Sequence, residues 1–341
     1  MDIWDSALHA IAATASPAYA AGRERAAGKW RASRAAAGIL LSLALFPYCG
    51  QASLAPDARL DKVLHRSWQT AQGLPQNSVL AIAQTPDGYL WLGTEEGLAR
   101  FDGVHFTVFD KHTPGLLNNQ INCLLTDRKG NLWIGTDGGG LSRLSHGKFT
   151  AYTSRNGLPN DSILALYEDE AGSLWIGTNG GGLARFTNGH FRIFTKANGL
   201  PDNTVCALSG DGRGNVWIGT HAGIGRFSHG VFQSPDIGAL GTAYVRAVYA
   251  GQRGILWAGT SDGLWRIGAG GTRKFTTADG LTSNTIFRIY EDRAGTLWIG
   301  TGAGGLNRYA KGRFSSFTES DGLMGKDVWS ILEDREGTLW I

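Results

Sequence analysis

Seven tryptophans recur along the chain at intervals of 40 to 42 residues, and this period limits the fold more than any other feature. Six of them open a W-x-G-T motif in which x is Ile, Leu or Ala, and the seventh is followed by the final residue, Ile341. The recurring residues are Trp91, Trp133, Trp175, Trp217, Trp257, Trp298 and Trp340. A repeat kept over most of 341 residues predicts an array of equivalent structural units.

Each unit contains the pattern of four short strands. A G-L-P turn or a variant of it opens the unit, and an apolar run such as SVLAIAQ (78–84) follows. A D-x-x-G turn leads into the tryptophan strand, a glycine-rich loop leads into G-L-x-R-F, and a hairpin such as FTNGHF (186–191) leads into the last strand. Four antiparallel strands in about 42 residues match one propeller blade. We therefore predict an all-β fold, a β-propeller of four-stranded antiparallel blades with seven blades, the last incomplete.

The ring must be closed by joining its last blade to its first. Residues 64–70 precede the first full unit, and Trp68 lies 23 residues before Trp91, where other units carry Phe or Tyr of an outermost strand. We expect residues 64–70 to complete the final blade, which would then have a first strand, part of a second and this fourth, but no third. A domain that ends inside a buried strand leaves backbone groups unpaired, so we expect the chain to be a piece of a longer protein.

Residues 1–55 differ from the repeats and have the features of an exported leader. A basic stretch, KWRASR (29–34), precedes AAAGILLSLALF (35–46), which is too short to span a bilayer but suits a secretory signal. We expect an N-terminal extension with a cleaved signal peptide over 1–55, an uncleaved anchor being the alternative. A propeller over 60–341, truncated at its C-terminus, would then be periplasmic. The net charge of +3 is carried mainly by the leader and does not indicate a nucleic-acid partner.

The glycine-rich loops and the turn aspartates each allow a chemical interpretation. TNGGGL (178–183) could hold a phosphate through backbone amides, and the D-x-x-G aspartates could bind a metal. Both features recur blade after blade, however, and no Walker lysine or metal-binding pair accompanies them. We expect the loops to be turns, the aspartates to cap their own turns, and the tryptophans to pack between neighbouring blades, with no cofactor and no metal.

Two segments carry a family resemblance. GLPQNSVLAIAQTPDGYLWLGTEEGLARFDGVHF (73–106) and GLPNDSILALYEDEAGSLWIGTNGGGLARF (157–186) resemble the two-component regulator propeller repeat, and the resemblance covers residues 64–341. Members of that family place one or two propellers outside the inner membrane. A β-sandwich, a membrane helix and a cytoplasmic output domain follow, commonly a histidine kinase or a diguanylate cyclase. The resemblance implies a non-catalytic extracytoplasmic sensor of a small molecule or glycan, able to act as a homodimer.

A ligand is expected at the mouth of the central channel, because two sets of loops emerge on that face. They join the fourth strand to the next first strand, and the second strand to the third. Polar or pattern-breaking residues there suit sugar hydroxyls or an anion, although Asn and Asp also favour such turns. The ligand-binding candidates are Asn77, Glu95, Asp137, Asp161, Asn179, Asn203, His221, Tyr244, Arg246, Asn284 and Arg288. The two arginines replace small or apolar residues of other blades, and either an anionic ligand or a neighbouring carboxylate would explain them.

Two other functions stay open from the sequence. A propeller enzyme similar to the streptogramin lyases would need an acid–base pair across the channel, and Glu95 with His221 is the combination available. A protein-binding platform would instead present a large exposed aromatic patch.

Overall fold

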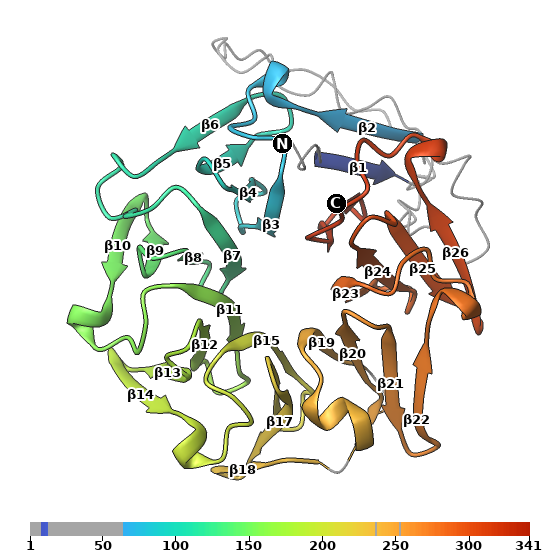
Figure 1. The fold of residues 1–341 in the computed structure, drawn as a ribbon. Coiled ribbons are helices and arrows are strands. Elements are labelled where there is room, and N and C mark those ends of the chain that lie inside the picture. Colours follow the sequence, from blue (N-terminus) through green and yellow to red (C-terminus); the bar gives the residue numbers. More distant parts are fainter. Residues whose placement is uncertain (1–7, 13–63, 236, 252–253) are drawn as a thin grey trace, which may run out of the picture.

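Seven antiparallel sheets stand around a common axis, each with its first strand innermost (Figure 1). The structure, a computed structural model, describes residues 8–12, 64–235, 237–251 and 254–341. Six sheets are complete blades made of consecutive strands, and the seventh, also four-stranded, combines strands from the two ends of the described chain. The predicted all-β propeller is confirmed.

Within a complete blade, consecutive strands are neighbours, so every blade is a meander that runs from the channel to the outer rim. The first strands are β3 (Val79–Gln84), β7 (Ile121–Thr126), β11 (Ile163–Glu168), β15 (Val205–Gly210), β19 (Val245–Ala250) and β23 (Ile286–Glu291). The second strands are β4 (Leu90–Thr94), β8 (Leu132–Thr136), β12 (Leu174–Thr178), β16 (Val216–Thr220), β20 (Leu256–Thr260) and β24 (Leu297–Thr301).

The outer half of each blade is less buried than the inner half. The third strands are β5 (Leu98–Phe101), β9 (Leu141–Ser145), β13 (Leu183–Thr187), β17 (Gly223–Ser228), β21 (Leu264–Gly268) and β25 (Leu306–Ala310). The fourth strands are β6 (Phe106–Phe109), β10 (Lys148–Tyr152), β14 (His190–Phe194), β18 (Val231–Gln233), β22 (Gly271–Phe275) and β26 (Arg313–Phe317). Side chains of the fourth strands are largely exposed or half-buried, which is expected of edge strands that face water.

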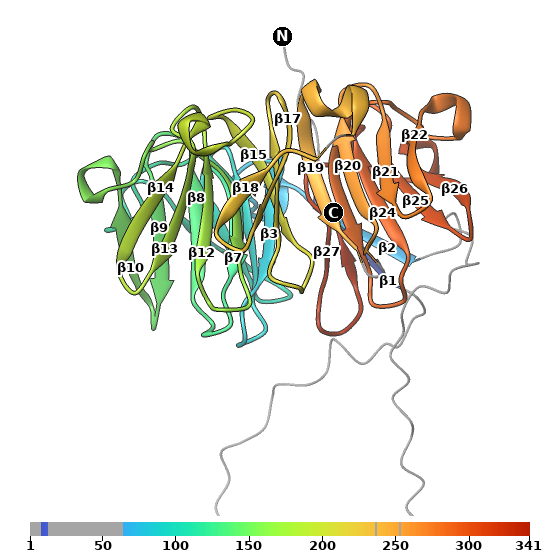
Figure 2. The ribbon, with the colours of Figure 1, turned by 90° about the horizontal axis from the view of Figure 1, so that it is seen from below.

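Short 3₁₀ helices lie between the fourth strand of one blade and the first strand of the next. They are η3 (Thr70–Gln72), η4 (Ser154–Asn156), η5 (Lys196–Asn198), η6 (Gly238–Thr242), η8 (Thr277–Asp279) and η9 (Glu319–Asp321). Figure 2 shows the ring from the side, with these helices gathered at one rim. Five of the six end at a left-handed glycine, the conformation that explains the G-L-P turn of the repeat. No helix of the described residues is long and apolar enough to cross a membrane.

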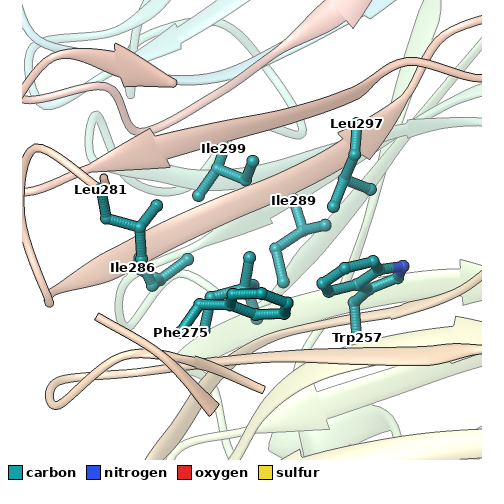
Figure 3. Packing of buried hydrophobic residues seen from close by; sticks show 9 residues of the cluster. Trp257, Phe275, Leu281, Ile286, Ile289, Leu297 and Ile299 are labelled. Atoms are coloured by element: carbon teal, nitrogen blue, oxygen red, sulfur yellow. The ribbon is translucent and has the colours of Figure 1, made fainter. Parts of the chain in front are cut away.

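The repeat tryptophans pack between neighbouring blades, as predicted. Trp257 lies among Ile286, Ile289 and Leu297 of the following blade (Figure 3). The turn aspartates support this packing. In the third blade, Asp169 Oδ1 accepts the Ser173 backbone N–H at 2.8 Å while its Oδ2 accepts the Trp175 indole N–H at 2.8 Å. The aspartates are turn caps, and four of the five also accept the indole N–H of their repeat tryptophan: Asp127, Asp169, Asp292 and Asp334.

The glycine of W-x-G-T has a different role from the glycines of the turns. A Cβ at Gly177 would lie 2.7 Å from the backbone oxygen of Val205 on the next blade, and a Cβ at Gly93 would lie 2.6 Å from the Ile121 side chain. These glycines therefore allow adjacent blades to touch along their inner halves.

The seventh sheet joins the two ends of the described chain, in the order β27 (Leu332–Glu333), β28 (Leu339–Trp340), β1 (Leu8–Ala12) and β2 (Leu64–Trp68) from the axis outward. Strand β2 is the outermost strand, as predicted from Trp68. The expectation that the third strand is missing is wrong, because β1 occupies that position and pairs with β28 through Ala10↔Trp340 and Ile11↔Leu339. The open edge of β28 offers backbone donors and acceptors that this segment satisfies. The rest of the predicted leader lies outside the described residues.

Candidate functional site

A cavity of about 590 Å³ occupies the central channel and extends to the loops of the rim that carries the short helices. Its wall comes from the first strands of all six complete blades and from Trp329 and Ser330, which precede β27. The loop residues Glu95, Gln120 and Tyr244 line it at the mouth. This volume is in the range of small-molecule sites.

The strand register sorts the channel wall into layers. Every complete first strand has a β-bulge between its first and third residues, so the second and third residues both line the cavity. The layer nearer the mouth contains Leu80, Asn122, Leu164, Cys206, Arg246, Phe287 and Trp329. The next layer contains Ala81, Cys123, Ala165, Ala207, Ala247, Arg288 and Ser330. Large side chains in the first layer are thus grouped on three consecutive sheets, and Arg288 is the single long side chain in the second.

Four residues on the side of the channel formed by the last three sheets make up what we term the stacked wall: Tyr244, Arg246, Phe287 and Trp329. The guanidinium carbon of Arg246 lies 4.4 Å from the ring centre of Tyr244 and 5.7 Å from that of Phe287. Phe287 and Trp329 are stacked, with ring centres 3.9 Å apart and planes within 7°. His221 packs edge-on against Tyr244 at 4.3 Å, which extends the wall towards the surface. Contact with the Tyr244 ring, and a longer approach to Phe287, restrict the position of the Arg246 guanidinium.

Arg288 extends from β23 into the channel below this layer. Burial lowers the pKa of Arg288, and its charge also acts on the Cys123 thiol of β7, a strand on the far side of the channel. Its side chain nevertheless retains accessible surface, as expected for a group surrounded by protein that faces an open channel. Neither Arg288 nor Arg246 forms a salt bridge with any carboxylate in the described part of the chain.

The other ionisable groups in the cavity offset little of the positive charge of the two arginines. Burial raises the pKa of Cys123 to about 12 and that of Cys206 to about 11, so both thiols are neutral at physiological pH. Glu95 is the one carboxylate among the described residues that line the cavity, and it accepts a hydrogen bond from Gln76 Nε2 at 3.0 Å. The lining carries two positive charges and one negative charge. No cluster of three or more metal-ligating side chains occurs among the described residues.

Four predicted loop residues share a structural task. Each uses its side-chain oxygen to accept the backbone N–H of the residue seven positions earlier, at 2.6 to 2.9 Å, and so fastens a short helix to the rim. These residues are Asn77, Asp161, Asn203 and Asn284. Asp137 accepts a hydrogen bond from the Ser162 hydroxyl of the next blade, and Asn179 has an exposed side chain. A ligand contact by any of these six stays a prediction.

The glycine-rich loops are turns, as predicted, and their amides are already used. The Gly182 N–H donates to the Asn203 carbonyl at 2.8 Å, and the Asn179 N–H donates to the Ser162 carbonyl at 3.0 Å. Ser162 precedes β11 of the same blade and Asn203 precedes β15 of the next blade, so these bonds tie the rim loops together. Donors engaged in this way do not form a phosphate cradle.

The acid–base pair considered for an enzyme is not assembled. Glu95 bonds to Gln76, His221 packs on Tyr244, and neither contacts the other. The structure therefore groups Tyr244, Arg246 and Arg288 with Glu95 around the cavity and places His221 beside Tyr244 at its edge.

Sequence reasoning missed Phe287, Trp329, Cys123 and Cys206 as channel residues. Trp329 could have been noticed, because it is a tryptophan outside the 42-residue period. The second position of each first strand varies between blades, and the third is Ala in all but two of the complete blades, but the bulge that turns both towards the axis is not visible in the sequence.

A family model described as "Two component regulator propeller" matches residues 73–96, 115–138, 157–180, 199–222, 280–303 and 322–341. The matched segments omit residues 223–279, which hold Tyr244 and Arg246. A search of curated proteins finds no match.

Solved structures share the propeller fold. The extracellular domain of a protein assigned as a hybrid two-component system from B. thetaiotaomicron is 24% identical, with a TM-score of 0.70, over 81% of this chain and 41% of that one. The extracellular domain of an assigned one-component system from the same organism is 21% identical, with a TM-score of 0.66, over 79% and 40%. Virginiamycin B lyase from Staphylococcus aureus is 16% identical, with a TM-score of 0.60, over 77% and 93%. The chain thus spans about two fifths of the sensor structures that it matches.

Proposed function

Because this chain belongs to the two-component regulator propeller family, we propose that it is an extracytoplasmic ligand-sensing propeller of a membrane signal-transduction protein. Its ligand, a small molecule or glycan, binds in the central channel from the rim that carries the short helices. In the intact protein a sandwich, a membrane helix and a cytoplasmic output domain receive the signal. The solved relatives that are extracellular sensor domains support this placement.

One observation carries the proposed site. The repeat makes the scaffold of every blade nearly the same, yet the cavity places two arginines on adjacent first strands, β19 and β23, without a salt bridge to a described residue. The corresponding arginines of the third strands do not line the cavity: Arg185 on β13 pairs with Asp169 at 3.1 Å, and Arg143 on β9 lies over the Trp133 ring. Charged groups left unpaired beside an open cavity are a feature of binding sites.

Signalling requires the ligand to bind one arrangement of the receptor better than another. We propose that occupation of the channel changes how two propellers of a dimer are oriented, and that the membrane helices transmit the change. The propeller alone then binds its ligand without producing an output.

The test is a binding screen with the purified 341-residue chain. A panel of neutral and acidic mono- and oligosaccharides and small organic acids is examined by thermal shift, then by calorimetry. A ligand at about 100 times its Kd raises the free energy of unfolding by about 2.7 kcal/mol, which gives a measurable shift. Arg288→Gln should weaken binding, whereas Arg313→Gln on the exposed outer strand β26 should not. The proposed site is contradicted if the chain binds no compound in the panel, or if Arg288→Gln leaves the affinity for the bound compound unchanged.

Export is tested separately. A C-terminal alkaline phosphatase fusion, active only outside the cytoplasm, should be active when the chain carries residues 1–63 and inactive when it starts at residue 64. Equal activity of the two fusions contradicts the proposed location.

A lyase function has weaker support. The lyase structure is 16% identical, so it shows a shared fold, and Glu95 and His221 do not contact each other. Conversion of any panel compound by the purified chain, lost in His221→Ala, would favour this alternative.

A further inference from the structure

The chemistry of the channel narrows the ligand class. We propose that the channel binds a ring-bearing monocarboxylate, with its carboxylate on Arg246 and Arg288 and its ring beside Phe287 and Trp329. This inference rests on the proposed function, because it assigns the substrate class of the same site. Aromatic acids and uronic acids both have the required chemistry.

Charge is the first step. Arg246 and Arg288 face the cavity against the one carboxylate of Glu95, so the described lining has an excess of one positive charge. Glu95 approaches the channel from the first blade, and its hydrogen-bond partner is Gln76 of that same blade. A ligand with a single negative charge neutralises the lining, whereas a dianion such as phosphate would reverse its sign.

The geometry of Arg246 is the second step. Its guanidinium carbon lies 4.4 Å from the ring centre of Tyr244 and 5.7 Å from that of Phe287, so two aromatic rings position this side chain at the cavity wall. The Arg246 Nε–H is buried and donates to no acceptor among the described protein atoms. An oriented guanidinium with unused donors suits a carboxylate, which can accept two parallel hydrogen bonds.

The third step is the asymmetry of the channel wall. The stacked wall is aromatic, while the first-layer residues on the other side include Leu80 and Leu164. Phe287 and Trp329 are half-buried and line the cavity, so part of this stack faces the ligand space. A flat aromatic surface on one side of the cavity favours a ligand with a ring, because aromatic and sugar rings both pack on aromatic faces.

The blade that departs from the repeat supports the same conclusion. The family model matches no segment within residues 223–279, which include both Tyr244 and Arg246. In that blade a five-residue helix, η6 (Gly238–Thr242), replaces the three-residue helices found before β11 and β23. The changes therefore coincide with the blade that supplies Tyr244 and Arg246, two of the four residues of the stacked wall.

The experiment compares acids with their neutral counterparts, using the full chain. Benzoate is paired with benzamide, and D-galacturonate with D-galactose, by calorimetry at low salt; inorganic phosphate is the fifth probe. We expect at least one acid to bind about tenfold or more tightly than its neutral partner, and phosphate to bind more weakly than that acid. Which pair responds distinguishes an aromatic acid from a uronic acid.

Variants then locate the effect. Arg246→Gln and Arg288→Gln should each remove most of the preference for the acid, while the control Arg313→Gln keeps it. Phe287→Leu should weaken acid and neutral compound together and leave their ratio unchanged. A thermal melt of each variant checks its folding, and Arg246→Lys, which keeps the charge but not the planar fork, should recover only part of the preference.

Several results would overturn the inference. They are equal affinity for acid and neutral partner, a preference that survives both glutamine variants, phosphate binding as tightly as the acid, or no binding of any acid. If a neutral glycan from the wider panel binds while the acids show no advantage, the proposed sensing function stands and the anionic ligand class fails.

Discussion

The third and fifth blades show how this propeller separates scaffold from site. Both contain a fully buried L-W-x-G-T second strand, β12 and β20, with the tryptophan packed against the next blade. In the third blade Asp169 fastens the turn and the indole, whereas Gly251 stands in that place in the fifth. The third blade lines the channel with Leu164 and Ala165, and the fifth lines it with Arg246 and Ala247.

The difference shows that a residue kept in both blades, the second-strand tryptophan, stabilises the packing between blades, whereas a residue that departs from the repeat, Arg246, lines the channel. A shared position must satisfy the same contacts in every blade, so it tolerates little change. Substitutions in the two blades should therefore have unequal effects.

The largest effect is expected from Trp175→Ala in the third blade. Trp175 is 1% exposed, packs against Phe194 and Phe227, and donates its indole N–H to Asp169. We expect a loss of about 3–5 kcal/mol in the free energy of unfolding, measured by urea denaturation. The control is Trp265→Ala, a half-buried tryptophan of the fifth blade outside the repeat position, which should cost less than half as much. Equal losses of stability in the two variants would contradict the distinction between repeat tryptophans and other tryptophans.

The next effect concerns the channel thiols and depends on pH. Because burial raises the pKa of Cys206 to about 11 against an ordinary value of 9.0, its thiolate is about 100-fold scarcer below pH 9. The experiment uses the Cys49→Ser variant, so that only Cys123 and Cys206 can react. Alkylation of Cys206 by iodoacetamide should be about 100-fold slower in the folded protein than in the urea-unfolded protein. The rate in the folded protein should keep rising tenfold per pH unit past pH 9. Cys123, with a pKa of about 12, should react more slowly still. A rate that levels off near pH 9 would contradict the burial of Cys206.

A smaller loss is expected from Gly177→Ala. The added Cβ would lie 2.7 Å from both the oxygen and the Cγ1 of Val205, so the two blades must separate slightly. We expect a cost of about 1–3 kcal/mol, measured by thermal denaturation. Gly270→Ala in the fifth blade is the matched control, since nothing lies within 4 Å of its Cβ, and it should be close to neutral. A neutral Gly177→Ala would show that the blades are not in close contact there.

The smallest effect is expected from Arg273→Gln on the outer strand of the fifth blade. Arg273 approaches Asp279 at 3.4 Å, but its side chain is 65% exposed, so solvent screens the pair. We expect a change of about 0–1 kcal/mol in the free energy of unfolding, which disappears at 1 M salt. A larger, salt-resistant loss would show that outer strands contribute more to the ring than their exposure suggests.

The sequence alone determined the repeat, the four-stranded blade and the closing role of Trp68, because each depends on short-range patterns that recur about every 42 residues. It also identified the turn aspartates as caps, since Asp169 and Ser173 are near neighbours in the chain. Arg246 and Arg288 were recognised as exceptions in the same way, by comparison of one blade with the next. Tertiary structure decided the rest.

Only the folded ring brought Phe287 and Trp329 into one stack, directed both bulged positions of each first strand into the channel, and placed Leu8–Ala12 in the seventh sheet. These outcomes depend on contacts between residues from different blades, or from opposite ends of the chain. The physical reason is that a local pattern specifies which strand a residue joins, whereas the empty space on the axis, and what faces it, exist only once all the sheets have closed around it.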